Sequence, residues 1–280
     1  MPVIATNTSA NTALIYLNKN SSEQSKSLAK LSSGSRIVRA SDDAAGLAVG
    51  TKLKADVTTL KQAATNAVQA RSVLQTADGA MARVGDILQR MKSLAAQAIS
   101  GSVDTTGRGF INTEYQQLLT EIGNISTTTQ FNGTNLINGS YSQTFQVGVA
   151  ATDIITVNFG ATGSIVNMST GTAGLAIAGT TVAGANGTAA TNASTNLDVA
   201  ITTVSTARAT VGALLSRFEY RGDVIDSSIE NLTSAQSAIM DVDIAAEQSN
   251  LVSRQVLTEA SIAALSQANQ MKSSLLALVR

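Results

Sequence analysis

Apolar residues recur at alternating steps of three and four positions along both ends of this chain. This spacing, present over residues 1–125 and 205–280, is typical of α-helices that pack along a coiled-coil seam. The stretch between the two ends is rich in Gly, Thr and Asn and holds almost no charge. The sequence therefore predicts a mainly α fold. Both chain ends would form one long antiparallel, coiled-coil helical bundle, with a small central β-hairpin region.

The composition removes the usual parts of an active site. The chain has no Cys and no His, so it lacks thiol nucleophiles, thiolate metal ligands and the commonest general base. Aromatic residues make up 3% of the chain and Trp is absent, which suits a thin bundle better than a broad globular core. Carboxylate–lysine and carboxylate–carboxylate chemistry stay open from these residues, but we expect no enzyme, no catalytic residue, no cofactor and no bound metal. The zero net charge favours neither nucleic acid nor an anionic membrane as a partner.

The beginning of the chain predicts neither a cleaved Sec signal nor a membrane anchor. It lacks a basic segment followed by a continuous apolar core, and no run of about 18 apolar residues occurs anywhere in the sequence. Two interpretations remain open from these residues, a cytoplasmic protein and a protein exported without a cleaved signal.

The two chain ends carry the predicted polymerisation seam. Helices are expected over residues 10–31 and 241–280, because each has apolar residues at heptad spacing. An ordinary bundle within one chain and a seam between copies both fit this periodicity. The seam residues share one heptad face on these two helices: Leu14, Leu17, Leu28, Leu31, Leu257, Ala264, Ala268, Met271, Leu275 and Leu278.

A long helix is predicted over residues 41–100, which would span roughly 90 Å at about 1.5 Å per residue. Its seam alternates four- and three-residue steps, with one repeated three-residue step between Ala67 and Ala70. Ser41 is the expected N-cap, and Asp42 and Asp43 would then lie in the first turn, where the helix dipole favours anions. A metal site is the alternative interpretation of these two carboxylates.

A shorter helix is expected over residues 111–125, and helix resumes near Asp198 with a seam that Arg221 interrupts. Between these helices, residues 144–149 and 154–159 read as β-strands joined by a short turn. We expect three parts: a terminal core (1–42 plus 240–280), an inner helical rod with β-hairpins (43–175 plus 195–239), and a short outer loop or excursion (176–194). The outer loop is predicted from its low-complexity, uncharged sequence.

Several motifs along the chain resemble bacterial flagellins. Residues 31–37 (LSSGSRI) and 41–48 (SDDAAGLA) are similar to the N-terminal signature of that family. The resemblance continues with 89–97 (QRMKSLAAQ), 130–133 (QFNG) and 265–270 (LSQANQ), in the order of the family. Several independent motifs covering about 200 of the 280 residues make the resemblance specific.

The resemblance implies a structural subunit of the bacterial flagellar filament, which assembles with copies of itself into a helical tube for swimming. It also implies secretion through the flagellar type III export apparatus with the help of a cytoplasmic flagellin chaperone. Assembly in the extracellular filament would then involve the flagellar cap and hook-junction proteins. The large outer domain of longer family members has little room here, so we expect a minimal subunit.

The resemblance further implies a patch that a vertebrate Toll-like flagellin receptor senses, made of Gln89, Arg90, Leu94 and Glu114. The chain departs from the family pattern beside this patch, at Ser93, where Glu is usual, and at Ala96, where a larger aliphatic residue is usual. Solvated charges over a core leucine are the alternative interpretation of these residues. For the whole chain, the alternative function is a flagellin-like hook–filament junction protein, which would be scarce in sheared filaments.

Overall fold

The computed structural model describes residues 7–160, 168–171, 174–184 and 187–278. Its contacts divide the chain into two compact units, each described separately below. Unit 1 comprises residues 1–57 and 230–280, and unit 2 comprises residues 58–229. The fold is mainly helical with two small antiparallel sheets, as the sequence predicts.

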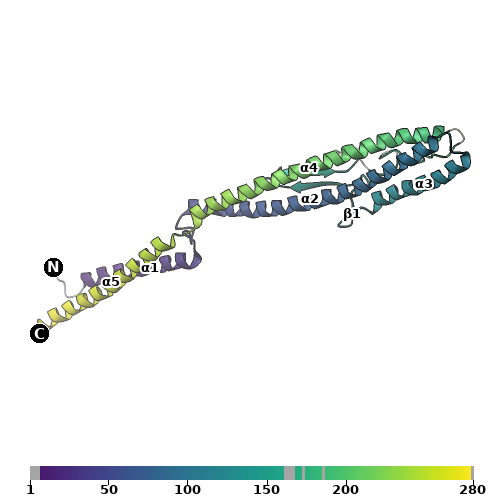
Figure 1. The fold of residues 1–280 in the computed structure, drawn as a ribbon. Coiled ribbons are helices and arrows are strands. Elements are labelled where there is room, and N and C mark those ends of the chain that lie inside the picture. Colours follow the sequence, from purple (N-terminus) through teal and green to yellow (C-terminus); the bar gives the residue numbers. More distant parts are fainter. Residues whose placement is uncertain (1–6, 161–167, 172–173, 185–186, 279–280) are drawn as a thin grey trace. The chain divides into compact units, whose positions relative to one another are not determined.

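Helices α1 (Thr8–Ser33) and α5 (Ile244–Leu278) lie side by side and antiparallel in unit 1 (Figure 1). The Asn7 side chain caps α1 by accepting a hydrogen bond from the Ala10 amide, and it donates another to the Ala268 carbonyl (3.1 Å). Gly34 ends α1 with a φ of 69°, a left-handed conformation that costs glycine little. The two helices together form the terminal helix pair.

A short backbone ladder closes the other end of the terminal helix pair. Arg36 donates its amide to the Met240 carbonyl (2.7 Å), and Val242 donates to the Gly34 carbonyl (3.1 Å). Both segments contain residues that leave a helix, so these hydrogen bonds satisfy backbone groups that the helices cannot.

Helix α2 (Ala44–Ile99) begins two residues later than the Ser41 cap would place it. Asp43 is the capping residue, because its carboxylate accepts a hydrogen bond from the Gly46 amide (2.9 Å). The Asp42 carboxylate accepts from the amides of Arg39 and Val38, and the Arg39 bond is the main reason that the pKa of Asp42 lies below its usual value. The two carboxylates therefore shape the turn before α2, which favours the structural interpretation over a metal site.

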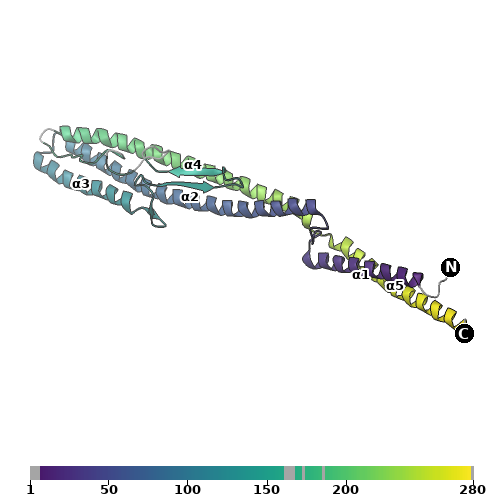
Figure 2. The ribbon, with the colours of Figure 1, turned by 180° about the vertical axis from the view of Figure 1, so that it is seen from behind.

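Helices α2, α3 (Thr105–Thr128) and α4 (Thr188–Met240) run side by side in unit 2 (Figure 2). From Leu60 onward, the buried face of α2 alternates three- and four-residue steps: Leu60, Ala63, Ala67, Ala70, Leu74, Ala77, Met81, Val84, Leu88, Met91, Ala95 and Ala98. The repeated three-residue step was expected between Ala67 and Ala70 but lies earlier, because Val57, Leu60 and Ala63 are all buried. Beyond that step the heptad continues to the end of the helix.

Helix α4 carries a matching buried seam, which includes Ala193, Leu197, Ala200, Val204, Ala207, Val211, Phe218 and Ile225. It begins at Thr188, ten positions before the expected Asp198, so residues 188–194 are helix and not part of an outer loop. The half-buried Arg221 takes a seam position, as predicted, and its Nε donates to the Val147 carbonyl (2.9 Å). The helical spacing of residues 188–194 was not recognised, because this stretch is rich in Ala and Thr and has low complexity.

By length and composition alone, α4 could cross a membrane, since its most apolar window has a mean hydropathy of 1.3. The sequence nevertheless holds no continuous run of about 18 apolar residues. The difference arises because Ala, Val and Leu at the seam raise the average while Thr residues interrupt the run. A helix that supplies the core of a bundle reaches the same average.

Two antiparallel hairpins follow α3. The first pairs β1 (Gln130–Phe131) with β2 (Thr134–Asn135), and the second pairs β3 (Ser142–Gln146) with β4 (Ile154–Asn158). Strand β3 starts and ends earlier than the expected 144–149, because residues 147–153 form the turn. Phe145 packs edge-on against Phe218 of α4, with ring centroids 6.0 Å apart, so this hairpin covers one side of the bundle.

Residues 174–184 are docked against α3. Leu175, Ile177 and Val182 are buried, and the Thr180 hydroxyl lies 2.8 Å from the Tyr115 hydroxyl. The side-chain oxygen of Asn112 accepts from the Val182 amide (3.1 Å). The expected projecting loop is therefore wrong for this segment, because apolar residues spaced among Gly and Thr fill the core of unit 2.

Candidate functional site

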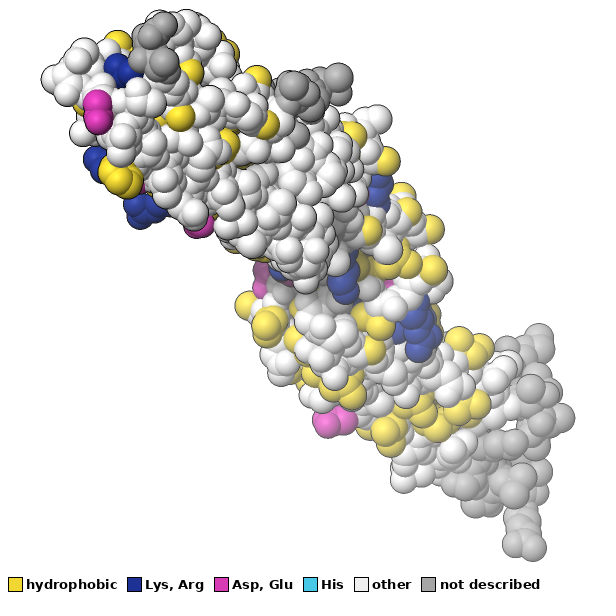
Figure 3. Space-filling view, turned by 90° about the vertical axis from the view of Figure 1, so that its right-hand side faces the viewer, with side chains coloured by type: hydrophobic (Ala, Val, Ile, Leu, Met, Phe, Trp, Pro, Cys, Tyr) yellow, Lys and Arg dark blue, Asp and Glu magenta, His cyan; other side chains and the backbone are white. Residues whose placement is uncertain are grey.

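The terminal helix pair exposes most of its large apolar side chains. Leu14 and Leu28 of α1 are 44% and 59% exposed, and Leu257 and Met271 of α5 are 44% and 53% exposed. Hydrophobic side chains gather on the visible face of this pair (Figure 3). Further exposed apolar residues on the same helices are Ile15, Tyr16, Ile244, Val252, Val256 and Ile262.

The face between α1 and α5 is, by contrast, largely polar or small. Its buried and half-buried positions keep the heptad steps, with Ala10, Ala13, Leu17, Asn20, Gln24, Ser27 and Leu31 on α1. The facing positions of α5 are Glu247, Leu251, Arg254, Thr258, Ser261, Leu265 and Ala268. Asn20 donates its side-chain amide to the Ser261 hydroxyl across this face (3.4 Å). Such a seam selects a register but supplies little apolar burial.

The structure divides the predicted polymerisation seam between these two faces. Leu17, Leu31 and Ala268 lie on the inner face, half-buried or buried. Leu14, Leu28, Leu257, Ala264 and Met271 lie on the exposed face. Leu275 and Leu278 belong to α5, but their side chains lie outside the described residues.

The second apolar face was not predicted, because only one stripe was assigned to each helix. Asn20 and Ser27 are buried, whereas the predicted seam residue Leu28 is exposed. The signal was available in the sequence: Ile15 lies roughly 100° around the helix from Leu14, outside the stripe that holds Leu14 and Leu17. A helix that is apolar on more than one side needs more than one packing partner.

Only part of the candidate receptor patch is exposed on the surface. The Arg90 guanidinium pairs with Glu114 of α3, with Nη2 and Nε at 2.7 and 2.8 Å from the same carboxylate oxygen. Gln89 is exposed beside them, whereas Leu94 is 2% exposed and lies in the core. The structure therefore brings Gln89, Arg90 and Glu114 together and leaves Leu94 beneath them.

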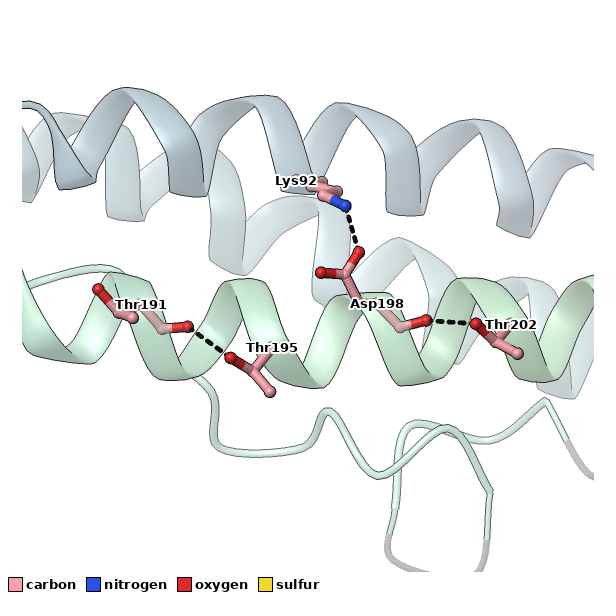
Figure 4. Close-up of polar contacts among 5 residues, drawn as sticks. All are labelled: Lys92, Thr191, Thr195, Asp198 and Thr202. Atoms are coloured by element: carbon pink, nitrogen blue, oxygen red, sulfur yellow. Dashed lines mark hydrogen bonds and ion pairs between the residues drawn. The ribbon is translucent and has the colours of Figure 1, made fainter.

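Ion pairs also join α2 to α4. Lys92 contacts Asp198, and Arg208 lies 2.9 Å from Asp78 (Figure 4 shows the first pair). The hydrogen bond that Arg208 donates to the Asp78 carboxylate is the main reason that the pKa of Arg208 is raised. Exposed pairs of this kind contribute about 0–1 kcal/mol each, so they align the helices more than they stabilise them.

Threonines on α4 use their hydroxyls within the helix. Thr195 donates to the Thr191 carbonyl (3.1 Å) and Thr202 to the Asp198 carbonyl (2.8 Å) (Figure 4). A hydroxyl occupied in this way satisfies the polar side chain without a partner outside the helix. Among the described residues, no cluster of Asp, Glu, His or Cys has the arrangement of a metal site.

The arrangement as a whole defines a class of protein. A bundle with buried apolar seams and a helix pair with exposed apolar faces are features of a structural subunit that associates with other proteins. The comparisons with known proteins then identify the family. The model for the N-terminal helical region of bacterial flagellin matches residues 4–142, and the model for its C-terminal helical region matches residues 194–279.

Curated relatives match nearly the whole chain. A flagellin of Halalkalibacterium halodurans is 37% identical over 93% of this chain and 93% of its own length. A flagellin of Bacillus subtilis is 36% identical over 98% of each chain. This chain belongs to the bacterial flagellin family, a family of structural proteins and not of enzymes.

A solved structure of much lower sequence identity has a similar fold. A protein designated as a flagellar hook-associated protein of Vibrio parahaemolyticus aligns with a TM-score of 0.58, covering 71% of this chain and 100% of that one. The two share 12% identity, so the likeness concerns the fold alone.

Proposed function

We propose that copies of this chain associate through the exposed apolar faces of α1 and α5. As a flagellin, the chain is a structural subunit of the extracellular bacterial flagellar filament, and it serves motility. One observation supports the proposed site: the inner face of the terminal helix pair mixes polar residues with a few Leu and Ala, and most of its large apolar side chains lie outside. Burying each of these side chains against a neighbour would contribute roughly 1.5–3 kcal/mol.

Electron microscopy of the purified protein after salt-induced assembly tests this proposal. Replacing both Leu257 and Met271 with Asp should prevent filament formation, because it buries unpaired charge at a cost of several kcal/mol. The matched control replaces the exposed Ala150 and Ala151 of the β3–β4 turn with Asp, which adds the same charge to unit 2. Normal filaments from the Leu257/Met271 variant would show that these faces are not the subunit contacts.

The export route and the helper proteins belong to the same proposal. The family resemblance supports secretion through the type III apparatus with a flagellin chaperone, followed by assembly with cap and hook-junction proteins. The division into a terminal core and a rod, without the outer loop, also remains a proposal. Its terminal core (1–42 plus 240–280) and its rod (43–175 plus 195–239) are supported by a contact division near residues 57 and 230.

Recognition by a Toll-like flagellin receptor is a further part of the proposal, carried by Gln89, Arg90 and Glu114. Their exposure and the ion pair between Arg90 and Glu114 support a preorganised polar surface. A receptor-reporter assay with Arg90→Ala should show a response lowered about tenfold or more, since interface hot spots are rich in Arg. The exposed Arg83→Ala, two helical turns away, is the matched control. Equal responses from both variants would remove Arg90 from the patch.

A further inference from the structure

An open groove of about 470 Å³ runs along one side of the terminal helix pair. One end of the groove is apolar and is lined by Ala13 and Tyr16 of α1 and by Ala260 and Ala264 of α5. These small side chains leave room beside the Tyr16 ring, which is itself more than half exposed. The apolar end therefore suits an aliphatic side chain from outside the chain.

The other end of the groove is basic. Lys19 and Arg254 line it, and neither makes an ion pair within the part of the chain that the structure describes. The neighbouring carboxylate is Glu23, which is engaged by Lys26 at 2.8 Å. Lys26 is the main cause of the lowered pKa of Glu23, and Arg254 and Lys19 contribute less. Three cations around one carboxylate leave this end with positive charge that suits an acidic group.

The exposed side of α5 carries a complementary pair of side chains. Glu259 is exposed and makes no ion pair among the described residues, and Ile262 is exposed one turn further along. In α5 the acidic residue precedes the apolar one. In the groove, the basic end at Arg254 likewise precedes the apolar end at Ala264. Glu259 and Ile262 of a second copy therefore come in the same order as the basic and apolar ends of the groove when the second α5 lies parallel to the first.

A parallel arrangement is also what a helical filament requires. Subunits in such a filament are related by rotation and translation, so equivalent helices point the same way and the contact is between two different faces. We infer that the groove receives Glu259 and Ile262 from the α5 helix of a second copy of this chain. Glu259 meets Lys19 and Arg254, and Ile262 lies against Ala260 and Ala264. This inference rests on the proposed assembly through α1 and α5.

Charge reversal tests the ionic half of the contact. Arg254→Glu and Glu259→Arg should each raise the critical concentration for polymerisation about tenfold or more, because each places like charges together. The double variant carries both reversals and should return to within about threefold of the unaltered chain. The two residues lie five positions apart on one helix, where they do not face each other, so the rescue would arise between copies. Single variants that polymerise normally, or a double variant without rescue, would overturn the inference.

Cysteine cross-linking tests the apolar half independently. The chain has no Cys, so a variant with Ala260→Cys and Ile262→Cys has only these two thiols. Residues two apart on a helix point to different sides and cannot form a disulfide with each other. Oxidised filaments of this variant should give a ladder of covalent multimers, whereas neither single variant should give more than dimers. Filaments without a ladder would overturn the inference while the proposed function stands; failure of the unaltered chain to polymerise would instead overturn the proposed function.

Discussion

Arg108 is 7% exposed, so its guanidinium lies inside a helical core. Its Nε donates to the Ala98 carbonyl in the last turn of α2 (2.9 Å), and its Nη1 donates to the Gly184 carbonyl (3.3 Å). The carbonyls at a helix end have no partner within the helix and carry partial negative charge. A buried cation donates hydrogen bonds to them and also interacts favourably with that charge.

Arg108→Ala should therefore lower the free energy of unfolding by about 2–4 kcal/mol, since it removes charge-assisted hydrogen bonds and leaves buried carbonyls unpaired. Urea unfolding of the monomer, followed by circular dichroism, measures the change. The matched control is Arg83→Ala, because Arg83 is 78% exposed and pairs with Asp86 at 3.3 Å on the surface, so its loss should cost less than about 1 kcal/mol. Equal effects from the two variants would contradict this role of Arg108.

The sequence could not have indicated Arg108. Its carbonyl partners lie 10 and 76 positions away, and the residue reads as an ordinary polar residue near a helix start. The charge pairs of the candidate sites show the same limit. Arg90 and Glu114 are neighbours through the antiparallel return of α3, and only the family resemblance had placed them in one patch. Local spacing predicts which residues share a helix face, whereas contacts between helices depend on the packing of the whole unit.

Tyr115 provides a pH-dependent contribution to stability. Burial raises the pKa of its hydroxyl, and the hydrogen bond with Thr180 opposes this only in part. The raised pKa means that the folded state holds the proton more tightly than the unfolded state, so the stabilisation is complete below a pH of about 10 and is lost above it. Tyr115→Phe should therefore reduce the fall in stability above about pH 10. Tyr220→Phe, at an exposed position, should leave the alkaline slope unchanged in thermal unfolding across that range.

Among the elements, the seams of α2 and α4 were largely predictable because heptad spacing is a local property of the sequence. The middle of the chain was not. Residues 174–184 have no repeated spacing, and their burial depends on pockets that α3 and α4 form only after packing. The inner face of the terminal helix pair was also misplaced, because two apolar faces overlap in the same helical spacing and the more apolar one points outward.

The docked middle segment should behave as core. Ile177→Ala should lower the free energy of unfolding of unit 2 by about 2–5 kcal/mol, since Ile177 is fully buried and the change leaves a cavity. Val199→Ala, on the exposed side of α4, should change it by less than about 0.5 kcal/mol. Denaturant unfolding measures both variants, and a neutral Ile177 variant would show that the segment is a dispensable loop.

At the scale of the whole molecule, the two units differ in how much apolar surface each can bury alone. Unit 2 has continuous seams of buried Ala, Leu, Val and Met along α2 and α4. On the inner face of the terminal helix pair, only Asn20, Ser27, Leu251 and Ala268 are buried among the described residues. Ordering the backbone costs roughly 1–2 kcal/mol per residue, which so polar a face does not offset. We therefore expect the terminal helices to be stable only when they pack against neighbouring subunits, as proposed above.

This difference predicts that folding of the ends is coupled to assembly. Hydrogen exchange should find the amides of residues 10–30 and 245–270 weakly protected in the monomer and strongly protected in the filament, because burial of their outer faces then contributes to their stability. The amides of residues 60–98 should be protected in both states, which provides the internal control within the same chain. Strong protection of residues 10–30 in the monomer would contradict the prediction. It would mean that the polar seam, with its contact between Asn20 and Ser261, is enough to hold the terminal helix pair together.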